Sequence, residues 1–310
     1  MSGVKTMVIY VILIIMVLVS VAFITLMERK ILGCSQIRLG PTLVGLWGIL
    51  QPFADAVKLF NKEGLLLRSI SSAIYLASPV FSLFFMMVIW VLLPLAAGGL
   101  SVNFTLLLFI CMSSVAVYPI ISSGWASNCK YSVLGSLRAV AQMVSYEVSL
   151  TVVLLSIIWL NSSFNLEEAL ESQSLTWNAL FLAPLMVIWK ITSLAETNRT
   201  PYDFSEGESE LVSGFNTEYT AGGFSLLFMA EYGNIIFMSL LFVLLFLTSS
   251  MDYTVMAKTM LISFLFIWVR ATLPRYRYDK LMYLAWKSLL PLSLFMLMFY
   301  FTVGYWMAAY

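Results

Sequence analysis

The sequence predicts an all-α, polytopic transmembrane helical bundle of about eight spans, built as a single integral membrane domain over residues 1–310. Of the 310 residues, 61% are hydrophobic and 11% are charged, whereas a water-soluble domain carries about 25% charged residues. The apolar residues gather in segments of about 20, the length that a helix needs to cross the hydrocarbon core of a bilayer. The net charge of +1 gives no electrostatic basis for binding nucleic acid.

Eight apolar segments are each long enough to span a bilayer as a helix. They cover residues 4–27, 70–95, 102–123, 133–160, 177–194, 221–247, 253–273 and 283–305. The seventh is the least apolar, because Lys258 and Arg270 fall within it, and Pro184 predicts a kink in the fifth. The first segment is too long for the apolar core of a signal peptide, and no Arg-rich transit peptide is seen, so no cleaved leader is expected.

The distribution of cations predicts the orientation. Every Lys and Arg except Lys5 and Lys258 falls on the connections that follow the first, third, fifth and seventh spans, or on their flanks. This is the asymmetry of the positive-inside rule, so both termini are expected to face the opposite compartment. In the first long connection, apolar residues recur at helical spacing from Leu43 to Phe60, which predicts an interfacial amphipathic helix bent at Pro52. A helix packed on the bundle would show the same pattern.

A polar stretch between the fifth and sixth spans concentrates negative charge. Its acidic residues are Glu196, Asp203, Glu206, Glu208, Glu210 and Glu218. Arg199 is the only cation among them, so their ionisations must be coupled. A solvated acidic loop would explain the same composition. Calcium is a second alternative because it prefers carboxylate oxygens, although the stretch lacks an EF-hand pattern.

Charged residues also occur inside the predicted spans. Glu147 lies in the fourth span, Glu231 lies in the sixth, and Lys190 precedes Glu196 at the end of the fifth. A charge at the bilayer centre costs roughly 2.5–3.5 kcal/mol, so it usually marks a buried polar path. The acids lie on separate spans and outnumber their cationic partners, which favours a proton relay. The alternative is a set of buried ion pairs that only fix the register of the helices.

The chain lacks the usual ligands of redox cofactors. It contains no histidine, and its three cysteines, Cys34, Cys111 and Cys129, form no CxxC pair. These absences exclude bis-His haem ligation and disfavour copper, zinc and iron–sulfur sites. We therefore expect no metal site and no catalytic residue in this chain, and we expect any redox cofactor to belong to a partner subunit.

Several motifs resemble those of one family. They are ERK at 28–30, QIRLGP at 36–41, QPFADAVKLF at 51–60, GSLRAVAQ at 135–142, SYEV at 145–148, AETNRTPYD at 195–203, EGESELVSGFN at 206–216 and RYRYD at 275–279. The motifs fall in the family's order, and the resemblance extends over nearly the whole chain. On these motifs the sequence resembles the family of NADH–ubiquinone oxidoreductase chain 1, the membrane subunits that carry the quinone tunnel of respiratory complex I.

The resemblance implies a core membrane subunit of a proton-pumping enzyme in the mitochondrial inner membrane, with its cationic connections facing the matrix. Ubiquinone would be the substrate, and NADH, FMN and the iron–sulfur clusters would be bound by partner subunits. The implied partners are the other membrane subunits, the peripheral-arm subunits and membrane lipid. The chain itself would hold no redox cofactor.

The resemblance also implies roles for single residues. The residues on or near the quinone tunnel would be Arg29, Arg38, Phe224 and Phe228. The proton path would comprise Asp203, Glu206, Glu208, Glu210, Glu218, Glu147, Glu196 and Glu231. Two positions depart from the family pattern: Gly64 stands where many members have proline, and Tyr283 stands where many have histidine. These departures affect the expected course of two loops and lie away from the path.

Two other classes of function remain open from the sequence. A stand-alone proton or cation secondary transporter would use the same acids near the membrane midplane. However, no inverted repeat is visible, and the polar stretch lies at one surface. The other alternative is a purely structural anchor for a soluble redox arm.

Overall fold

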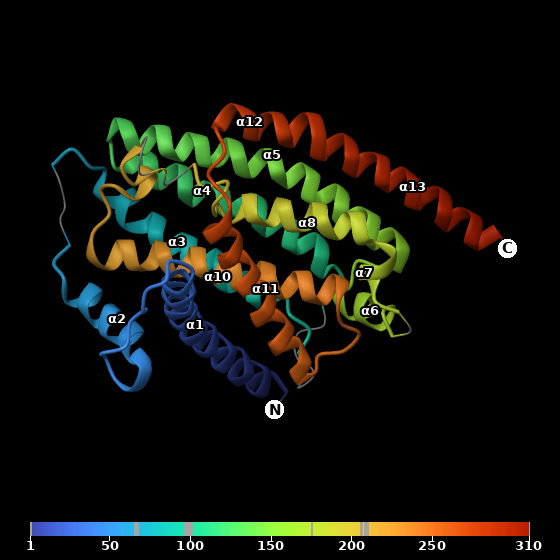
Figure 1. Cartoon of the computed structure of the whole chain (residues 1–310), viewed down its shortest axis with the longest axis horizontal. Helices are drawn as coiled ribbons and strands as arrows, with labels where there is room; N and C mark the ends of the chain where they lie inside the picture. The colour runs from blue at the N-terminus through green and yellow to red at the C-terminus, as the bar shows by residue number, and fades with distance from the viewer. Residues whose placement is uncertain are drawn as a thin grey trace.

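The computed structural model describes residues 2–64, 68–95, 102–174, 176–204, 207 and 211–309, which form helices joined by turns and loops (Figure 1). No strand occurs within these ranges. The predicted all-helical architecture is therefore confirmed. Glu206, Glu208 and Glu210 of the predicted proton path lie outside the described residues.

Within the described ranges, seven helices are long and apolar enough to cross a membrane. Six of them are α1 (Ser2–Ser35), α3 (Ser72–Trp90), α4 (Thr105–Ala126), α5 (Lys130–Asn161), α10 (Ala221–Phe246) and α11 (Tyr253–Thr272). The seventh is a continuous helix made of α12 (Tyr278–Tyr283), a π-helical turn (Leu284–Leu289) and α13 (Leu290–Ala309). Their positions match seven of the eight predicted spans.

The remaining predicted span, 177–194, is a broken helix. Its two parts are α7 (Asn178–Phe181) and α8 (Ala183–Glu196), which meet at the non-helical residue Leu182. Pro184 lies in the first turn of α8, where proline is tolerated because its missing N–H has no helical partner. The predicted kink is thus found as a break, and each part is shorter than a spanning helix.

The connections differ from the predictions in two places. The amphipathic helix is α2 (Gln51–Asn61), which is preceded by a short 3-10 turn at Leu46–Gly48. Pro52 lies in the first turn of α2 and so begins the helix, which corrects the prediction that it bends a longer one. The connection between the fourth and fifth predicted spans contains the short helix α6 (Leu166–Glu171), and the N–H of Glu167 in its first turn donates a hydrogen bond to the side chain of Asn165.

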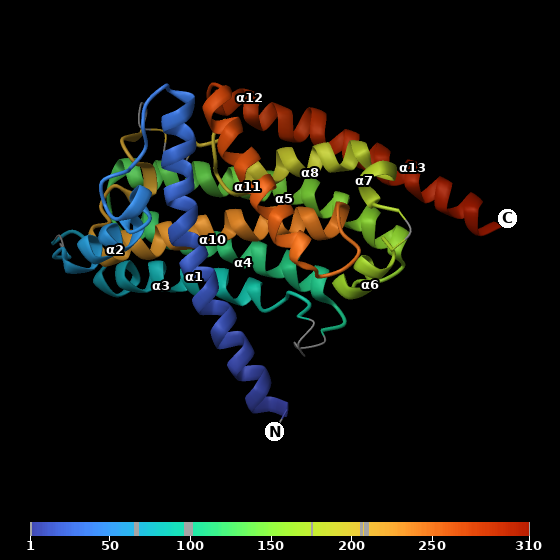
Figure 2. The same cartoon turned by 60° about the horizontal axis from the view of Figure 1, so that its bottom comes forward.

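Helix α10 lies at the centre of the bundle and is buried on most of its circumference. The outer helices instead expose large apolar side chains, as a lipid-facing surface requires. The N-terminal half of α1 crosses the bundle obliquely and extends beyond it, and α13 extends past the other helices toward the C-terminus (Figure 2). Among the seven long helices described, α10, which contributes to both cavities of the candidate site, is therefore the most buried.

Three polar side chains fix the end of α10. Gln173 donates a hydrogen bond to the carbonyl of Leu244, Asn178 donates to that of Leu245, and Lys258 donates to that of Leu247. The last carbonyls of a helix have no intrahelical partner, and leaving them bare in a membrane would cost several kcal/mol each. The positive charge of Lys258 also complements the helix dipole at this end.

The segment that enters α10 is docked against the bundle by close backbone packing. Gly135 of α5 faces Gly214, and a Cβ added to Gly135 would lie 2.9 Å from the Cα of Gly214. Nearby, Ser132 donates a hydrogen bond of 3.2 Å to the carbonyl of Phe215. The rings of Tyr75 and Tyr219 stack with their centroids 4.3 Å apart. These contacts hold the C-terminal end of the acidic stretch.

Candidate functional site

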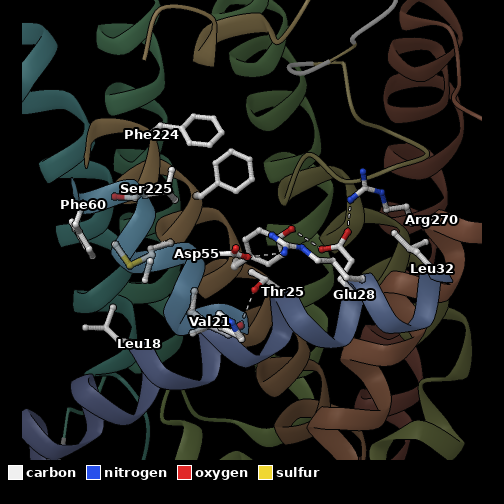
Figure 3. Close-up of a pocket in the computed structure, with 18 residues that line it drawn as sticks. Leu18, Val21, Thr25, Glu28, Leu32, Asp55, Phe60, Phe224, Ser225 and Arg270 are labelled. Atoms are coloured by element: carbon white, nitrogen blue, oxygen red, sulfur yellow. Dashed lines mark hydrogen bonds and ion pairs between the residues drawn. The ribbon is translucent and has the colours of Figure 1, made fainter. Parts of the chain in front are cut away.

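A cavity of about 390 Å³ lies between α1, α2, α10 and α11. Most of its lining is apolar, but polar side chains gather at one end (Figure 3). In the figure Glu28 and Arg270 mark this polar end, and Phe60 and Phe224 lie toward the other. An apolar cavity with a few convergent polar groups is the usual form of a small-molecule site.

The polar end is organised by Glu28, whose side chain is buried among three partners. Arg270 of α11 forms an ion pair with its Oε1, and the guanidinium of Arg199 lies 3.6 Å from the same oxygen. Tyr232 of α10 donates a hydrogen bond of 2.6 Å to Oε2. One carboxylate is thus shared by two cations and a phenol, so the cluster carries a net positive charge that favours an anionic group on the ligand.

Arg199 is held as a cation although it is buried. Burial disfavours its charge, but the phenol of Tyr232 and the carboxylate of Glu28 outweigh this effect, so the pKa of Arg199 is raised above its ordinary value. Its guanidinium also lies 4.3 Å from the centroid of the Tyr232 ring. A cation over an aromatic face in a desolvated place contributes about 2 kcal/mol.

A second ion pair joins α1 to α2. Arg29 and Asp55 approach to 2.6 Å, and their side chains are 51% and 32% exposed, respectively. Both residues line the cavity, so this pair places a charged group of each sign beside its apolar wall. Its exposure makes it a weaker contributor to stability than the buried cluster around Glu28.

Three of the four residues predicted near a quinone line this cavity: Arg29, Phe224 and Phe228. The rings of Phe224 and Phe228 have centroids 4.3 Å apart and form part of the apolar wall. Arg38, the fourth, lies exposed in the loop after α1 and is not among the residues that line the cavity.

A second, smaller cavity of about 60 Å³ brings together two of the predicted path acids, Glu196 and Glu231. Glu196 is the last residue of α8, and its Oε2 is buried without a hydrogen-bond partner in the described part of the chain. Glu231 interacts electrostatically with Arg199, which in turn contacts Glu28. Arg199 therefore lies between the two cavities.

Glu147 on α5 is the next acidic residue after Glu231 and Glu196, and with them it forms a series of carboxylates. Its carboxylate accepts hydrogen bonds from the hydroxyls of Ser113, at 3.3 Å, and Ser114, both on α4. It is also close enough to Glu196 for the two charges to interact. Glu147 is only partly buried, so this end of the series approaches the outer surface of α4 and α5.

The acids outside the spans are placed differently. Asp203 is buried, and its Oδ2 lies 3.1 Å from the guanidinium of Arg275. The backbone carbonyl of Glu218 accepts a hydrogen bond of 2.7 Å from Tyr75, and its side chain is partly exposed. Neither residue lines the two cavities described above.

Comparison with known proteins places this arrangement in a family. The sequence profile described as NADH dehydrogenase matches residues 8–301. The chain belongs to this family. It is 54% identical to the NADH-ubiquinone oxidoreductase chain 1 of Anopheles gambiae over 303 residues, which cover 96% of each chain. The protein of the same name from Hylobates lar is 49% identical over 300 residues, which cover 94% of each chain.

In this NADH dehydrogenase family chain, the central residue of the larger cavity was not singled out from the sequence. In the sequence Glu28 stands out only as part of the ERK motif, and Arg199 and Arg270 stand out only as cations on the cation-rich side. Tyr232 has no signal of its own in the sequence beyond its position next to Glu231. The available signal was a carboxylate at the end of the first apolar run, together with an arginine inside the least apolar span. Charges in such places need partners, which only the fold identifies.

The described residues contain no group of three or more His, Cys, Asp or Glu side chains arranged to hold a metal ion. The three acids outside the described ranges leave the calcium alternative for the acidic stretch untested.

Proposed function

We propose that this chain forms the quinone-access cavity of NADH:ubiquinone oxidoreductase and the first part of the carboxylate path that couples quinone reduction to proton translocation. Its family membership makes it a multi-pass subunit of this enzyme in the mitochondrial inner membrane, where it assembles with the other subunits. The observation that carries the proposal is the position of Arg199, which contacts Glu28 in the larger cavity and interacts with Glu231 in the smaller one.

The larger cavity suits a ligand that has a long apolar part and a polar head. The isoprenoid tail of ubiquinone would lie along the wall formed by Phe224, Phe228 and the apolar residues of α1 and α2. The head group would reach the polar end near Glu28 and Arg270. Arg38, which lies outside the lining, would act at the entrance of the tunnel.

The electrons would come from a partner subunit, because no redox cofactor is expected in this chain. Reduction of a quinone to a quinol takes up two electrons and two protons, so negative charge develops at the head group before protons arrive. Arg199, Arg270 and Tyr232 surround Glu28 and would stabilise such a negative charge. NADH, FMN and the iron–sulfur clusters would be held by the partners.

The resulting change of charge would pass through a series of interacting groups. It runs from Glu28 to Arg199, then to Glu231 and Glu196, and ends at Glu147. A shift of protonation at one member alters the electrostatic energy of the next, and the low dielectric of the membrane interior strengthens this coupling. The acids of the loop, Asp203, Glu206, Glu208, Glu210 and Glu218, would connect the quinone site to this series.

The serine pair on α4 supports the role of Glu147. A partly exposed carboxylate at membrane depth is costly, so the face formed by α4 and α5 would be covered by another membrane subunit in the assembled enzyme. Ser113 and Ser114 would keep the carboxylate oriented toward this boundary. Protons could then be exchanged with acids of the neighbouring subunit.

The proposal is tested by Glu196→Gln and Glu147→Gln, each in the assembled complex reconstituted into vesicles. We expect proton translocation coupled to NADH oxidation to fall by at least about tenfold, which corresponds to roughly 1.4 kcal/mol of lost coupling. Glu167→Gln in α6 is the matched control, because Glu167 lies exposed at the opposite end of the bundle. Unchanged quinone turnover and unchanged translocation in both path variants would overturn the relay.

A further inference from the structure

The last transmembrane helix carries a surface hollow that plays no part in the proposed quinone site or carboxylate path. The hollow has a volume of about 480 Å³ and lies at the end of the helix where α12 meets the π-helical turn. It is lined by Asp279, Lys280, Tyr283, Leu284 and Ser288. This end belongs to the cation-rich side of the membrane, as the distribution of Lys and Arg predicts.

The charges around the hollow leave two cations available. Asp279 is engaged by Arg277 at 3.1 Å, so its carboxylate is already compensated. In the described part of the chain, neither Lys280 nor Lys287 forms an ion pair with a carboxylate. The ammonium group of Lys287 instead lies 4.4 Å from the centroid of the Tyr283 ring. The hollow therefore suits an anionic group.

An exposed apolar face continues from the hollow along α13. Within α13, on the other side of the π-helical turn from Lys280, one face of the helix carries Phe295, Met298, Phe299 and Tyr305. Phe295 is 70% exposed and Met298 is 63% exposed, although both are large and apolar. The 20 residues of α13 extend about 30 Å, which is the thickness of the hydrocarbon core.

The size of these side chains distinguishes between two occupants. Transmembrane helices that pack against one another use small residues, which let the two backbones approach closely. The exposed face of α13 presents Phe, Met and Tyr instead, and Tyr305 and Trp306 at its far end are typical of the aromatic belt at a lipid interface. The face is therefore better suited to flexible acyl chains than to a second helix.

We propose that this face binds an anionic phospholipid, with its phosphate at Lys280 and Lys287 and its acyl chains along the exposed side of α13. The hydroxyl of Ser288 already donates to the carbonyl of Leu284, so the lysines supply the attraction for the phosphate. Basic groups at the cation-rich ends of transmembrane helices recognise anionic head groups in this way. The site is separate from the quinone cavity, so it does not depend on the proposed function.

The test uses the assembled complex after most lipid has been removed. A photoactivatable phosphatidylglycerol is added, and labelled peptides are mapped by mass spectrometry, with a phosphatidylcholine probe of the same acyl chains as the comparison. We expect the anionic probe to label residues 280–299 preferentially. The double variant Lys280→Gln, Lys287→Gln should lower the apparent affinity about 25-fold, because each lysine near an anionic head group contributes roughly fivefold.

Lys58→Gln with Lys62→Gln on and after α2 is the matched control, since it removes the same charge from the same side of the membrane and should leave labelling at 280–299 unchanged. Equal labelling by both probes, or an unchanged affinity in the double variant, would overturn the proposal. Displacement of the probe by inorganic phosphate alone would also overturn the proposal, because the apolar face of α13 would then contribute nothing to binding. If the double variant does not assemble, labelling of the unaltered complex is measured at increasing salt concentration. Attraction between the lysines and the phosphate weakens as salt rises, so labelling by the anionic probe should fall, and unchanged labelling would overturn the proposal.

Discussion

The hydroxyl of Tyr232 donates a 2.6 Å hydrogen bond to Oε2 of Glu28, joining the centre of α10 to the end of the first transmembrane helix. The two residues are 204 positions apart in the chain. Both are buried, and both line the larger cavity. Glu231, the neighbour of Tyr232, lines the smaller one. Adjacent residues of one helix thus line two cavities, so under the proposed coupling a change at Glu28 would reach the carboxylate series through α10 as well as through Arg199.

Removal of the Tyr232 hydroxyl tests the hydrogen bond between α10 and Glu28 with the smallest change in structure. Tyr232→Phe keeps the ring and its contact with Arg199 but removes the hydrogen bond to Glu28. A hydrogen bond to a charged group contributes about 1.5–3 kcal/mol, so we expect kcat/KM for the quinone to fall by at least about tenfold while assembly is retained. Steady-state kinetics with a soluble quinone measures the effect. Tyr118→Phe, at an exposed tyrosine of α4, should leave kcat/KM unchanged. Normal kinetics in Tyr232→Phe would show that the hydrogen bond has no role in the site.

The two carboxylates that line the cavity should differ strongly in their contribution to stability. Glu28→Gln leaves Arg199 and Arg270 without their shared anion, and breaking a buried pair in this way costs about 3 kcal/mol or more. Asp55→Asn breaks the ion pair with Arg29, whose exposure limits the loss to about 1 kcal/mol or less. Thermal unfolding of the purified complex compares the two variants. An equal shift of Tm for both would contradict the assignment of Glu28 as the buried centre.

The positions of the spans could be predicted because the bilayer imposes a length on each apolar segment. The segments predicted from residues 221 and 253 begin where α10 and α11 begin, at Ala221 and Tyr253. Helix α1 differs, since it continues to Ser35 through the charged residues that limit its apolar run. It can do so because Glu28 finds partners from α11 and from the loop after α8, and such distant pairings leave no trace in local composition.

The candidate site was predictable to a similar extent. Intramembrane acids such as Glu147 and Glu231 stand out because their charge is costly in lipid. Glu28 lies just after the first predicted span and Arg270 lies near the end of the seventh, and the fold alone shows that they are partners. The break at Leu182 had a local signal in Pro184, whereas the six-residue helix α6 is too short for a periodic pattern to reveal it.

The contact between Gly135 and Gly214 predicts a strict requirement for glycine at position 135. Gly135→Ala would place a methyl group 2.9 Å from the Cα of Gly214, and such overpacking costs about 1–3 kcal/mol. The end of the acidic stretch should therefore detach from α5, and amide hydrogen exchange over residues 211–219 should become faster. Gly222→Ala is the control, because an added Cβ there has no atom within 4 Å. Equal protection in both variants would show that this packing does not hold the stretch.

The phenol of Tyr219 predicts a loss of stability at alkaline pH. Burial raises its pKa, and the nearby Tyr75 adds to this while the hydrogen bond with Ser78 opposes it, so the pKa rises from 10.0 to about 12. An unfolded tyrosine ionises near pH 10 while the native one stays neutral, so the stabilisation is fully present below pH 10 and is lost as the pH rises to about 12. Each pH unit in this interval removes about 1.4 kcal/mol.

Tyr219→Phe removes this ionisable group, so the stability of the variant should fall less steeply as the pH rises. The variant will be less stable than the native complex at pH 8, because Ser78 loses its 2.8 Å hydrogen bond to the phenol, but the difference should narrow as the pH is raised. Thermal unfolding at pH 8 to 11 follows the two proteins, with Tyr305→Phe as a control at an exposed tyrosine. Parallel curves over the whole range would mean that Tyr219 ionises in the native protein at the same pH as an unfolded tyrosine.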